Sequence, residues 1–148
     1  MELNIAVLPG DGIGPEVTNE TVKVIHTISK KFNHKINISE GLTGATAIDK
    51  TGNPYPDQTH EICKKSDAIL FGAIGDPKYD NNPGAKVRPE QGLLDMRKKL
   101  GLYANLRPTI VFESLINNSP LRKDRIINID LIFVRELTGG IYFGERGR

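Results

Sequence analysis

Residues 4–15 read Asn4-Ile5-Ala6-Val7-Leu8-Pro9-Gly10-Asp11-Gly12-Ile13-Gly14-Pro15, and this stretch decides the fold. A short apolar strand ends in a turn that contains three glycines, and a helix follows at once. Pro15 suits the first helical position, where its missing N–H costs nothing. Apolar residues at helical spacing predict an amphipathic helix over 16–32. Its largely apolar face is formed by Val17, Thr21, Val24, Ile25, Ile28 and Phe32.

The next segments continue the alternation of strands and helices. Ile36 and Ile38 alternate with polar residues and predict a second strand. Gly52-Asn53-Pro54 predicts a turn, and a short helix is predicted over 56–65. The run 68–74 is apolar on both faces, as in a central strand of a parallel sheet that helices cover on each side. This order is the α/β pattern, so we expect a parallel or mixed sheet with flanking helices.

The rest of the chain contains one long loop and several shorter elements. Residues 75–89 are rich in Gly, Pro, Asp and Asn, and a loop of that length inside a compact domain is usually functional or disordered. A helix is predicted over 90–100. Extended segments are predicted over 102–111, where Pro108 confines the strand to an edge or a bulge, over 130–135, and, after the turn Thr138-Gly139-Gly140, over 141–144.

The composition excludes several classes of protein. The length of 148 residues suits one domain, and 20 Lys and Arg against 18 Asp and Glu give a net charge of +2 with no basic stripe for nucleic acid. No apolar run approaches the roughly 20 residues of a membrane helix, and no secretory signal is visible. We therefore expect a cytoplasmic protein without a membrane or nucleic-acid partner. Cys63 is alone, so an intrachain disulfide is impossible, and a buried helix thiol is its expected role.

The turn Gly10-Asp11-Gly12-Ile13-Gly14 invites comparison with a dinucleotide-binding fingerprint. That fingerprint needs G-x-G-x-x-G between strand and helix and an acidic residue about 20 residues further on. Here the third glycine comes one residue early and Pro15 follows it, and Glu40 lies too far beyond the turn to bind a ribose. A tight structural turn is therefore the favoured interpretation, ahead of pyrophosphate binding.

The helix that begins at residue 90 carries a mixed face. Four residues at positions i, i+3, i+4 and i+7 share this face: Glu90, Leu93, Leu94 and Arg97. On this helix alone, two core leucines between solvated charged residues are the better interpretation. The functional alternative is a site for a small molecule that is part alkyl and part carboxylate.

Two further arginines favour the functional alternative. Arg107 and Arg135 each lie in or at the end of a predicted strand. Arginine binds a carboxylate through paired hydrogen bonds, so together with Arg97 they could bind a di- or tricarboxylate. Tyr142 follows the glycine turn; packing is the usual role of a strand tyrosine, and a phenol can also act as a general acid. The residues alone thus predict an α/β protein with a carboxylate site.

Several stretches taken together resemble the isocitrate/isopropylmalate dehydrogenase family, and above all its isopropylmalate branch. The matching stretches are 6–17, Pro77-Lys78-Tyr79, 89–94 with Arg97, 104–108 and 135–144, so the resemblance runs along the whole chain. The motif at residues 10–15 belongs to the wider family. Leu93-Leu94 and the segment that ends at Tyr142 are most specific to the isopropylmalate branch. The resemblance implies the family's fold, in incomplete form.

The resemblance assigns substrate roles to individual residues. Leu93 and Leu94 would contact the isopropyl group of the substrate. Arg97, Arg107 and Arg135 would bind the malate carboxylates. Tyr142 would be the catalytic residue that donates a proton to the enol left after decarboxylation.

The resemblance also assigns a cofactor side. Glu90 would lie between substrate and nicotinamide, and the segment 75–90 would border the cofactor. The cofactor-binding residues so implied are Gly75, Asp76, Pro77, Lys78, Pro89 and Glu90. Asp76 stands where members of the family often carry Gly. The family binds NAD without a Rossmann fingerprint, which agrees with the structural interpretation of the glycine turn.

The implied reaction oxidises 3-isopropylmalate at C2 with NAD and then decarboxylates the product with the help of Mg²⁺ or Mn²⁺. The product, 4-methyl-2-oxopentanoate, belongs to leucine biosynthesis. The implied partners are the small-molecule substrate and, in the full-length enzyme, a second copy in a homodimer. Metal-binding aspartates, a lysine from the partner subunit and the adenosine-binding loop of the family all lie beyond residue 148, so no metal ligand is expected in this chain.

Because family chains are far longer, we expect an inactive N-terminal fragment. Residues 1–101 would belong to a first, cofactor-side domain, and residues 102–148 would begin a second domain for dimerisation and substrate binding. One alternative is a dehydrogenase of the isocitrate or homoisocitrate type. Leu93 and Leu94 argue against it, because a third carboxylate would need a polar partner there. Another alternative is a complete, non-catalytic carboxylate-binding protein.

Overall fold

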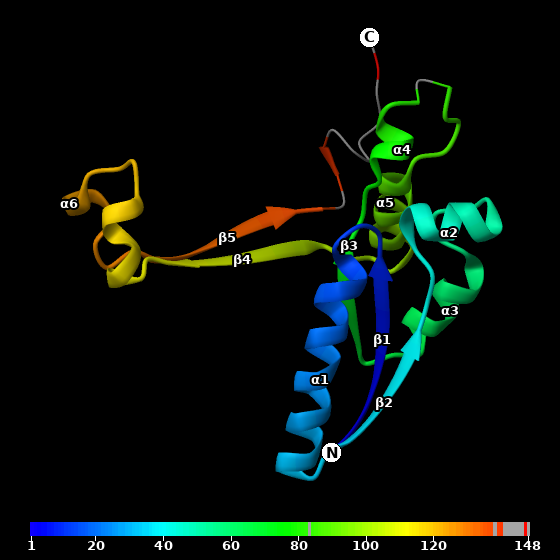
Figure 1. The fold of residues 1–148 in the computed structure, drawn as a ribbon, viewed down its shortest axis with the longest axis horizontal. Coiled ribbons are helices and arrows are strands. Elements are labelled where there is room, and N and C mark those ends of the chain that lie inside the picture. Colours follow the sequence, from blue (N-terminus) through cyan, green and yellow to red (C-terminus); the bar gives the residue numbers. More distant parts are fainter. Residues whose placement is uncertain (83, 138, 141–146, 148) are drawn as a thin grey trace. The chain divides into compact units, whose positions relative to one another are not determined.

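The structure is a computed structural model, and it describes residues 1–82, 84–137, 139–140 and 147. The chain forms two compact units, Met1–Leu100 and Gly101–Arg148. That these units belong to a cofactor-side domain (1–101) and to a dimerisation domain (102–148) stays a prediction. The first unit contains, in chain order, β1 (Glu2–Gly10), α1 (Gly14–Phe32), β2 (Lys35–Glu40), α2 (Gly44–Thr51), α3 (Asp57–Lys64), β3 (Ala68–Ala73), α4 (Pro77–Asp80) and α5 (Pro89–Lys99) (Figure 1).

The first unit is built on a parallel sheet with the strand order β2-β1-β3. Ile5 pairs with Ile38 on one side of β1, and Ala6 pairs with Ile69 on the other. Helix α1 connects β1 to β2, and α2 and α3 lie in the connection that returns past β1 to β3 (Figure 1). The predicted α/β fold with a parallel sheet and flanking helices is therefore confirmed.

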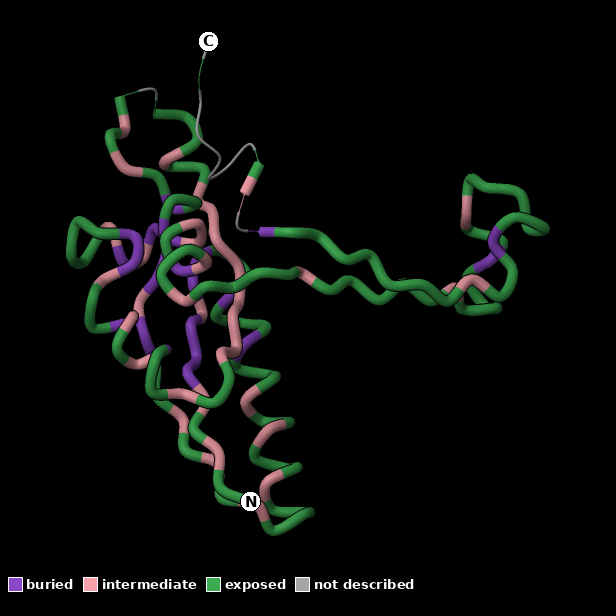
Figure 2. The backbone as a smooth tube through the Cα atoms, turned by 180° about the vertical axis from the view of Figure 1, so that it is seen from behind, coloured by how far each residue is buried: buried purple, intermediate pink, exposed green. Residues whose placement is uncertain are grey.

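The core of this unit lies between the sheet and helices α3 and α5. Side chains alternate between the two faces of a strand, so Ala6 and Leu8 of β1 point to the same side. Both are inaccessible to solvent, and they cluster with Tyr55, Cys63 and Met96. In Figure 2 the buried segments of the first unit include much of β1. Cys63 is thus the expected buried helix thiol, and burial raises its pKa.

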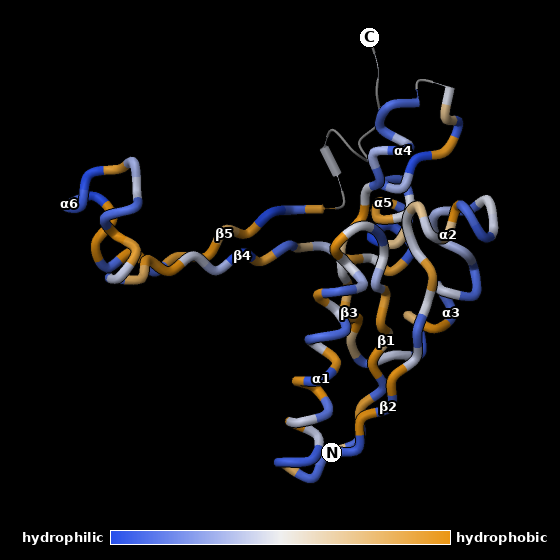
Figure 3. Tube along the Cα trace, viewed as in Figure 1, coloured by the Kyte–Doolittle hydropathy of each residue, from blue (hydrophilic) through white to orange (hydrophobic). Residues whose placement is uncertain are grey.

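Helix α1 turns a different face to the sheet from the one its apolar pattern predicts. Gly14 and Thr18 are its buried residues, and a side chain at Gly72 of β3 would lie 3.1 Å from the Thr18 methyl group. Small residues therefore allow a close approach of helix and sheet. Most of the predicted apolar face is solvent-exposed instead, including Val24 (55%) and Phe32 (56%), although apolar residues recur along α1 (Figure 3). Pro15 is the second helical residue, not the first.

The prediction of a central strand over 68–74 is wrong for the described part of the chain. The central strand is β1, while β3 lies at an edge of the sheet and its residues are half-buried or exposed. The central position was predicted from the apolar composition of the segment. A run of apolar residues does not specify how many strands pair with it. In the first unit, helices α2 and α4 were not predicted, and α4 lies inside the expected long loop.

The described part of the second unit is a two-stranded antiparallel ribbon with two short helices in its connection. Its elements are β4 (Ala104–Ile110), η1 (Glu113–Asn118), α6 (Lys123–Ile126) and β5 (Asp130–Glu136). The predicted strands over 102–111 and 130–135 correspond to β4 and β5. Pro108 lies in β4, which pairs with β5 alone among the described strands, as expected for an edge. The strand predicted over 141–144 lies outside the described residues.

None of the described helices is both long and apolar enough to cross a membrane.

Candidate functional site

The glycines of the turn after β1 are required by the chain's own packing. Gly10 has a φ of +74°, and a Cβ atom there would lie 2.0 Å from the carbonyl oxygen of Ala73. A Cβ atom at Gly14 would lie 2.0 Å from the carbonyl oxygen of Pro9. The space beside both residues is thus occupied by backbone. This geometry favours a structural turn over a pyrophosphate site.

Asp11, in the middle of this turn, joins three parts of the first unit. Its side chain is 3% exposed. The carboxylate accepts hydrogen bonds from the backbone amides of Ala45 (2.8 Å), Thr46 (2.9 Å) and Gly75 (3.1 Å). The first two amides lie in the first turn of α2, where Thr43 provides no side-chain cap. Asp11 therefore caps α2 from the turn after β1, and it also binds the amide of Gly75, at which the predicted cofactor segment begins.

The ends of β1 and β3 define the place where a ligand is expected in this topology. The chain leaves β1 toward β2 on one side and later returns to β3 on the other, so β1 and β3 flank a switch point. In open α/β sheets, ligands bind outside the carboxyl ends of the strands at such a point. Gly75 follows β3 at this end of the sheet. The predicted cofactor residues after β3 are consistent with this rule.

The segment after β3 is held by side chains within and outside it. The Asp76 carboxylate accepts a hydrogen bond from the Lys78 amide (2.9 Å) and caps the single turn of α4. Pro77 is the first helical residue. Asp49 of α2 accepts hydrogen bonds on one oxygen, Oδ1, from Lys78 Nζ and from the Tyr79 hydroxyl, both at 2.7 Å. These bonds lower the pKa of Asp49 and raise that of Lys78.

Helix α5 brings the second half of the predicted cofactor residues close to the first. Pro89 is buried at its first position, and the Arg88 amide donates to the Gln91 side chain (3.0 Å) at the start of the helix. A Cβ atom built at Gly75 would lie 3.6 Å from Oε1 of Glu90. The structure thus places the exposed carboxylate of Glu90 beside the start of the 75–80 segment.

The predicted substrate face of α5 divides into two parts. Leu93 is half-buried and packs against the core cluster around Ala6 and Leu8, as the structural interpretation of this helix requires. Leu94 and Arg97 are half-exposed and lie one helical turn apart. Within residues 1–82 and 84–100, Arg97 makes no hydrogen bond or ion pair.

The other two arginines lie together on the ribbon of the second unit. In the β4–β5 register Arg107 is opposite Phe133, and Asn105 is opposite Arg135. Opposite residues of an antiparallel pair share a face, so both arginines project from the same side as diagonal neighbours. Arg107 Nε donates to the Asn105 side chain (3.1 Å). The opposite face is apolar and exposed, with Leu106 at 63% and Val134 at 69%.

The structure places some of the predicted residues near one another, and their roles stay predictions. It brings Gly75 to Glu90, and Arg107 to Arg135, each within one unit. Tyr142 lies outside the described residues. Sequence reasoning missed Asp11 and Asp49, although an aspartate between two glycines is itself a signal that a carboxylate is needed inside the turn.

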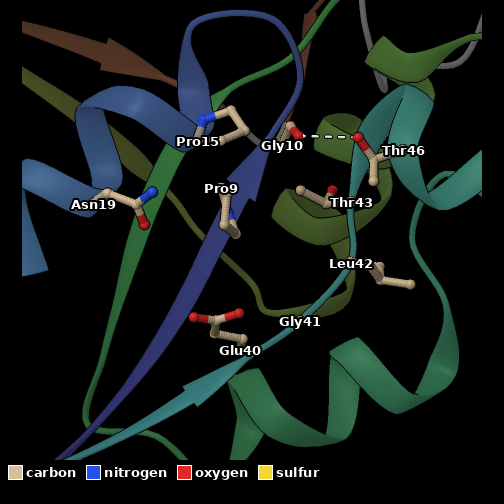
Figure 4. Close-up of a pocket in the computed structure, with 9 residues that line it drawn as sticks. All are labelled: Pro9, Gly10, Pro15, Asn19, Glu40, Gly41, Leu42, Thr43 and Thr46. Carbon is tan, nitrogen blue, oxygen red and sulfur yellow. Dashed lines mark hydrogen bonds between the residues drawn. The ribbon is translucent and has the colours of Figure 1, made fainter.

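A cavity of about 340 Å³ lies elsewhere in the first unit, between the start of α1 and the ends of β1 and β2. It is lined by Pro9, Gly10, Pro15, Asn19, Glu40, Gly41, Leu42, Thr43 and Thr46 (Figure 4). The Thr46 hydroxyl donates to the Gly10 carbonyl oxygen across its rim (3.2 Å). Glu40 is the charged residue among these, so the cavity does not suit a carboxylate ligand.

A metal centre is not found in the part of the chain that the structure describes. No three His, Cys, Asp or Glu side chains come together there in a way that could hold an ion. Asp11 and Asp49 are both engaged in hydrogen bonds. The described residues therefore do not fit a divalent cation.

Comparison with known proteins gives consistent results. A family model described as isocitrate/isopropylmalate dehydrogenase matches residues 4–148. The chain is 56% identical over 146 residues to a 3-isopropylmalate dehydrogenase of Bacteroides fragilis, covering 99% of this chain and 41% of that protein. It is 54% identical over 145 residues to a 3-isopropylmalate dehydrogenase of Bacillus subtilis, covering 98% of this chain and 40% of that protein. The chain thus spans about two fifths of the length of these relatives.

Solved structures agree with the sequence comparisons. The chain matches an isocitrate dehydrogenase from Methylococcus capsulatus with a TM-score of 0.73 and 30% identity, over 95% of this chain and 36% of that one. It matches a β-decarboxylating dehydrogenase from Thermococcus kodakarensis with a TM-score of 0.63 and 30% identity, over 90% and 33%. The chain therefore belongs to the isocitrate/isopropylmalate dehydrogenase family.

Proposed function

We propose that this chain is the N-terminal part of an NAD-dependent enzyme that oxidises and decarboxylates 3-isopropylmalate to 4-methyl-2-oxopentanoate, a step of leucine biosynthesis. The observation that carries the proposal is the face of α5 where the apolar Leu94 lies one turn from the half-exposed Arg97, which makes no hydrogen bond or ion pair within residues 1–82 and 84–100. Such a face suits a ligand with an alkyl group and a carboxylate. The identity of 52–56% to curated relatives with this activity in their names supports it.

In this proposal individual residues of the chain have separate roles toward the substrate. Arg97, Arg107 and Arg135 bind its carboxylates through charge-assisted hydrogen bonds. Leu94 contacts the isopropyl group, and Leu93 supports Leu94 from the core side. Tyr142 donates the proton to the enol that remains after decarboxylation.

We place the cofactor at the switch point of the sheet, outside the carboxyl ends of β1 and β3. Gly75, Asp76, Pro77 and Lys78 border NAD together with Pro89 and Glu90. The absence of a side chain at Gly75 leaves room beside the Glu90 carboxylate, which supports this placement. NAD supplies the hydride acceptor, and Mg²⁺ or Mn²⁺ bound by residues outside this chain supplies a Lewis acid. We further propose that the complete enzyme is a cytoplasmic homodimer.

The proposal is tested in a chimera, here called the completed chimera. It joins residues 1–148 to the remaining C-terminal part of the Bacteroides fragilis relative. We expect it to reduce NAD with 3-isopropylmalate as substrate. Arg97→Gln should lower kcat/KM about 10- to 100-fold, because a hydrogen-bonded ion pair to the substrate is lost. Lys98→Gln, on the exposed side of the same helix, is the matched control. An Arg97→Gln variant as active as the control would contradict the proposed role of α5.

A second candidate is an isocitrate-type dehydrogenase, which the structural match to such an enzyme favours. That match has 30% identity, well below the identity to the 3-isopropylmalate dehydrogenases. Isocitrate also carries a third carboxylate where the α5 face offers leucine. We therefore place this candidate second.

A further inference from the structure

The single turn of α4 depends on contacts outside itself. A helix this short gains little from its own hydrogen bonds, because the cost of starting a helix is spread over few residues. The hydrogen bond from the Lys78 amide to Asp76 joins neighbouring residues, so it does not fix the position of α4 relative to other elements. Among the described residues, the hydrogen bonds that join α4 to another helix or strand are those of Asp49 with Lys78 and Tyr79.

Asp49 binds two consecutive residues of α4 through one oxygen. Lys78 Nζ and the Tyr79 hydroxyl both lie 2.7 Å from Oδ1, and Lys78 Nζ also lies 5.3 Å from the centre of the Tyr79 ring. Because a lysine and a phenol reach the same atom, α4 can neither rotate nor shift along α2 without losing one bond. The Asp49 and Lys78 side chains are 47% and 60% exposed. An ion pair so exposed contributes little to overall stability, so its effect is local.

Helix α2 is linked to the 75–80 segment at a second point. Asp11 accepts hydrogen bonds from the first turn of α2 and from the amide of Gly75. Near the other end of α2, Asp49 binds Lys78 and Tyr79. The segment is therefore tied to α2 at its beginning and at α4. Helix α2 also packs against α5, which carries Glu90.

We propose that Asp49 is a positioning residue, which holds α4 so that the 75–80 segment and Glu90 form one cofactor-binding surface. The inference rests on the proposed function for the identity of the cofactor. It assigns no contact between Asp49 and the cofactor. Asp49 acts through Lys78 and Tyr79.

The test uses Asp49→Ala, Asp49→Asn and Lys78→Met in the completed chimera. Glu2→Gln is the matched control, because Glu2 also accepts hydrogen bonds from a lysine (Lys35, 2.7 Å) and a second side chain (Asn37, 3.2 Å), at the opposite end of the sheet. We expect Asp49→Ala to raise the KM for NAD about three- to tenfold, with kcat and the KM for 3-isopropylmalate changed less than about twofold. Asp49→Asn, which still accepts from Tyr79, should have a smaller effect.

A second readout does not depend on activity. Amide hydrogen exchange over residues 76–82 should become faster in Asp49→Ala and stay unchanged in Glu2→Gln, while the amides of β1 stay protected in both. Asp49→Asn and Lys78→Met should be non-additive, because they remove the same ion pair. Unchanged exchange in Asp49→Ala would overturn the positioning role. Faster exchange with an unchanged KM for NAD would overturn its link to the cofactor. An inactive parent chimera would instead contradict the proposed function. Amide hydrogen exchange over residues 76–82 would still test whether Asp49 holds α4 in place.

Discussion

The carboxylate of Asp11 accepts hydrogen bonds from three backbone amides although it is almost inaccessible to water. Two of these amides lie in the first turn of α2, and the third lies at the start of the 75–80 segment. Removing the carboxylate would leave buried donors unsatisfied, which costs more than the net value of the bonds themselves. The residue is thus a structural requirement of the turn, and the glycines around it make room for the packing.

We predict that Asp11→Ala destabilises the first unit by about 2–5 kcal/mol, because one buried and two partly buried amide donors lose their acceptor. The measurement is the exchange rate of the Ala45, Thr46 and Gly75 amides in the completed chimera, which reports the free energy of local opening. Asp67→Asn is the control, since Asp67 accepts from the Asn4 amide (2.7 Å) on the exposed surface. Exchange at these amides that is no faster than in the control would show that Asp11 does not hold the turn.

At the scale of elements, α4 should depend on pH through Asp49 and Lys78. The pKa of Asp49 is lowered by the hydrogen bonds it accepts from Lys78 and Tyr79, so their stabilising effect is present above the ordinary carboxyl pKa of about 4 and is lost as pH falls through the lowered value. The pKa of Lys78 is raised by its hydrogen bond to Asp49, so the effect is lost again as pH rises through that raised value. Between these limits α4 stays attached to α2.

The carboxyl ¹³C shift of Asp49, followed against pH in the completed chimera, measures this dependence. We expect a midpoint below that of an ordinary aspartate, and Lys78→Met should move the midpoint upward because the cation is gone. A midpoint that Lys78→Met leaves in place would mean that the ion pair does not form in solution.

Helix α5 should not tolerate a side chain at Gly92, despite the preference of helices for alanine. A Cβ atom there would lie 2.4 Å from the carbonyl oxygen of Pro54, so the helix would have to move away from the turn after α2. We expect Gly92→Ala to destabilise by about 1–3 kcal/mol, although alanine gains about 1 kcal/mol in intrinsic helix propensity. The measurement is the thermal midpoint of the completed chimera, with Lys98→Ala as the control on the same helix. A Gly92→Ala variant more stable than the parent would contradict the close packing of α5.

The same elements show what could be predicted from sequence. Strong local signals predicted the elements β1, α1, β2, α3, β3, α5, β4 and β5, because each has an apolar pattern or a clear turn at its end. Helix α2 was missed because the side chain that caps it comes from Asp11, more than 30 residues away along the chain. The buried face of α1 was missed because Gly14 and Thr18 are not large apolar residues. Their burial depends on close packing of Gly14 against Pro9 and Ala73 and of Thr18 against Gly72.

In the candidate site, too, local features could be predicted from the sequence and contacts between distant residues could not. The face shared by Leu93, Leu94 and Arg97 could be predicted because it lies within one helix. That Leu93 also serves the core could not, since the cluster it joins comes from β1, α3 and the residue Tyr55 between helices. The shared face of Arg107 and Arg135 depends on strand register, which a short local pattern does not specify.

At the scale of the whole molecule, the second unit exposes a large apolar surface. Leu106, Ile110, Ile132 and Val134 lie on one face of the β4–β5 ribbon and are each more than half exposed, at 63%, 56%, 60% and 69%. The strands are green along most of their length in Figure 2. A two-stranded ribbon is at best marginally stable without a further layer. The relatives are more than twice as long as this chain, so further sequence could supply that layer.

We therefore predict that residues 1–148 on their own do not unfold in one cooperative step. Amides of β1 should be protected from hydrogen exchange, while those of β4 and β5 exchange rapidly. Circular dichroism and tyrosine fluorescence should then give different unfolding midpoints. Coincident two-state transitions of a monomer with protected β4 and β5 amides would contradict this prediction.

The central claim is that these residues recognise 3-isopropylmalate. The most direct measurement is the ratio of kcat/KM for 3-isopropylmalate to kcat/KM for isocitrate in the completed chimera with NAD. We predict turnover of 3-isopropylmalate and a ratio of at least about 100, because the α5 face offers leucine where a third carboxylate would need a polar partner. Turnover of isocitrate but not of 3-isopropylmalate would contradict the claim.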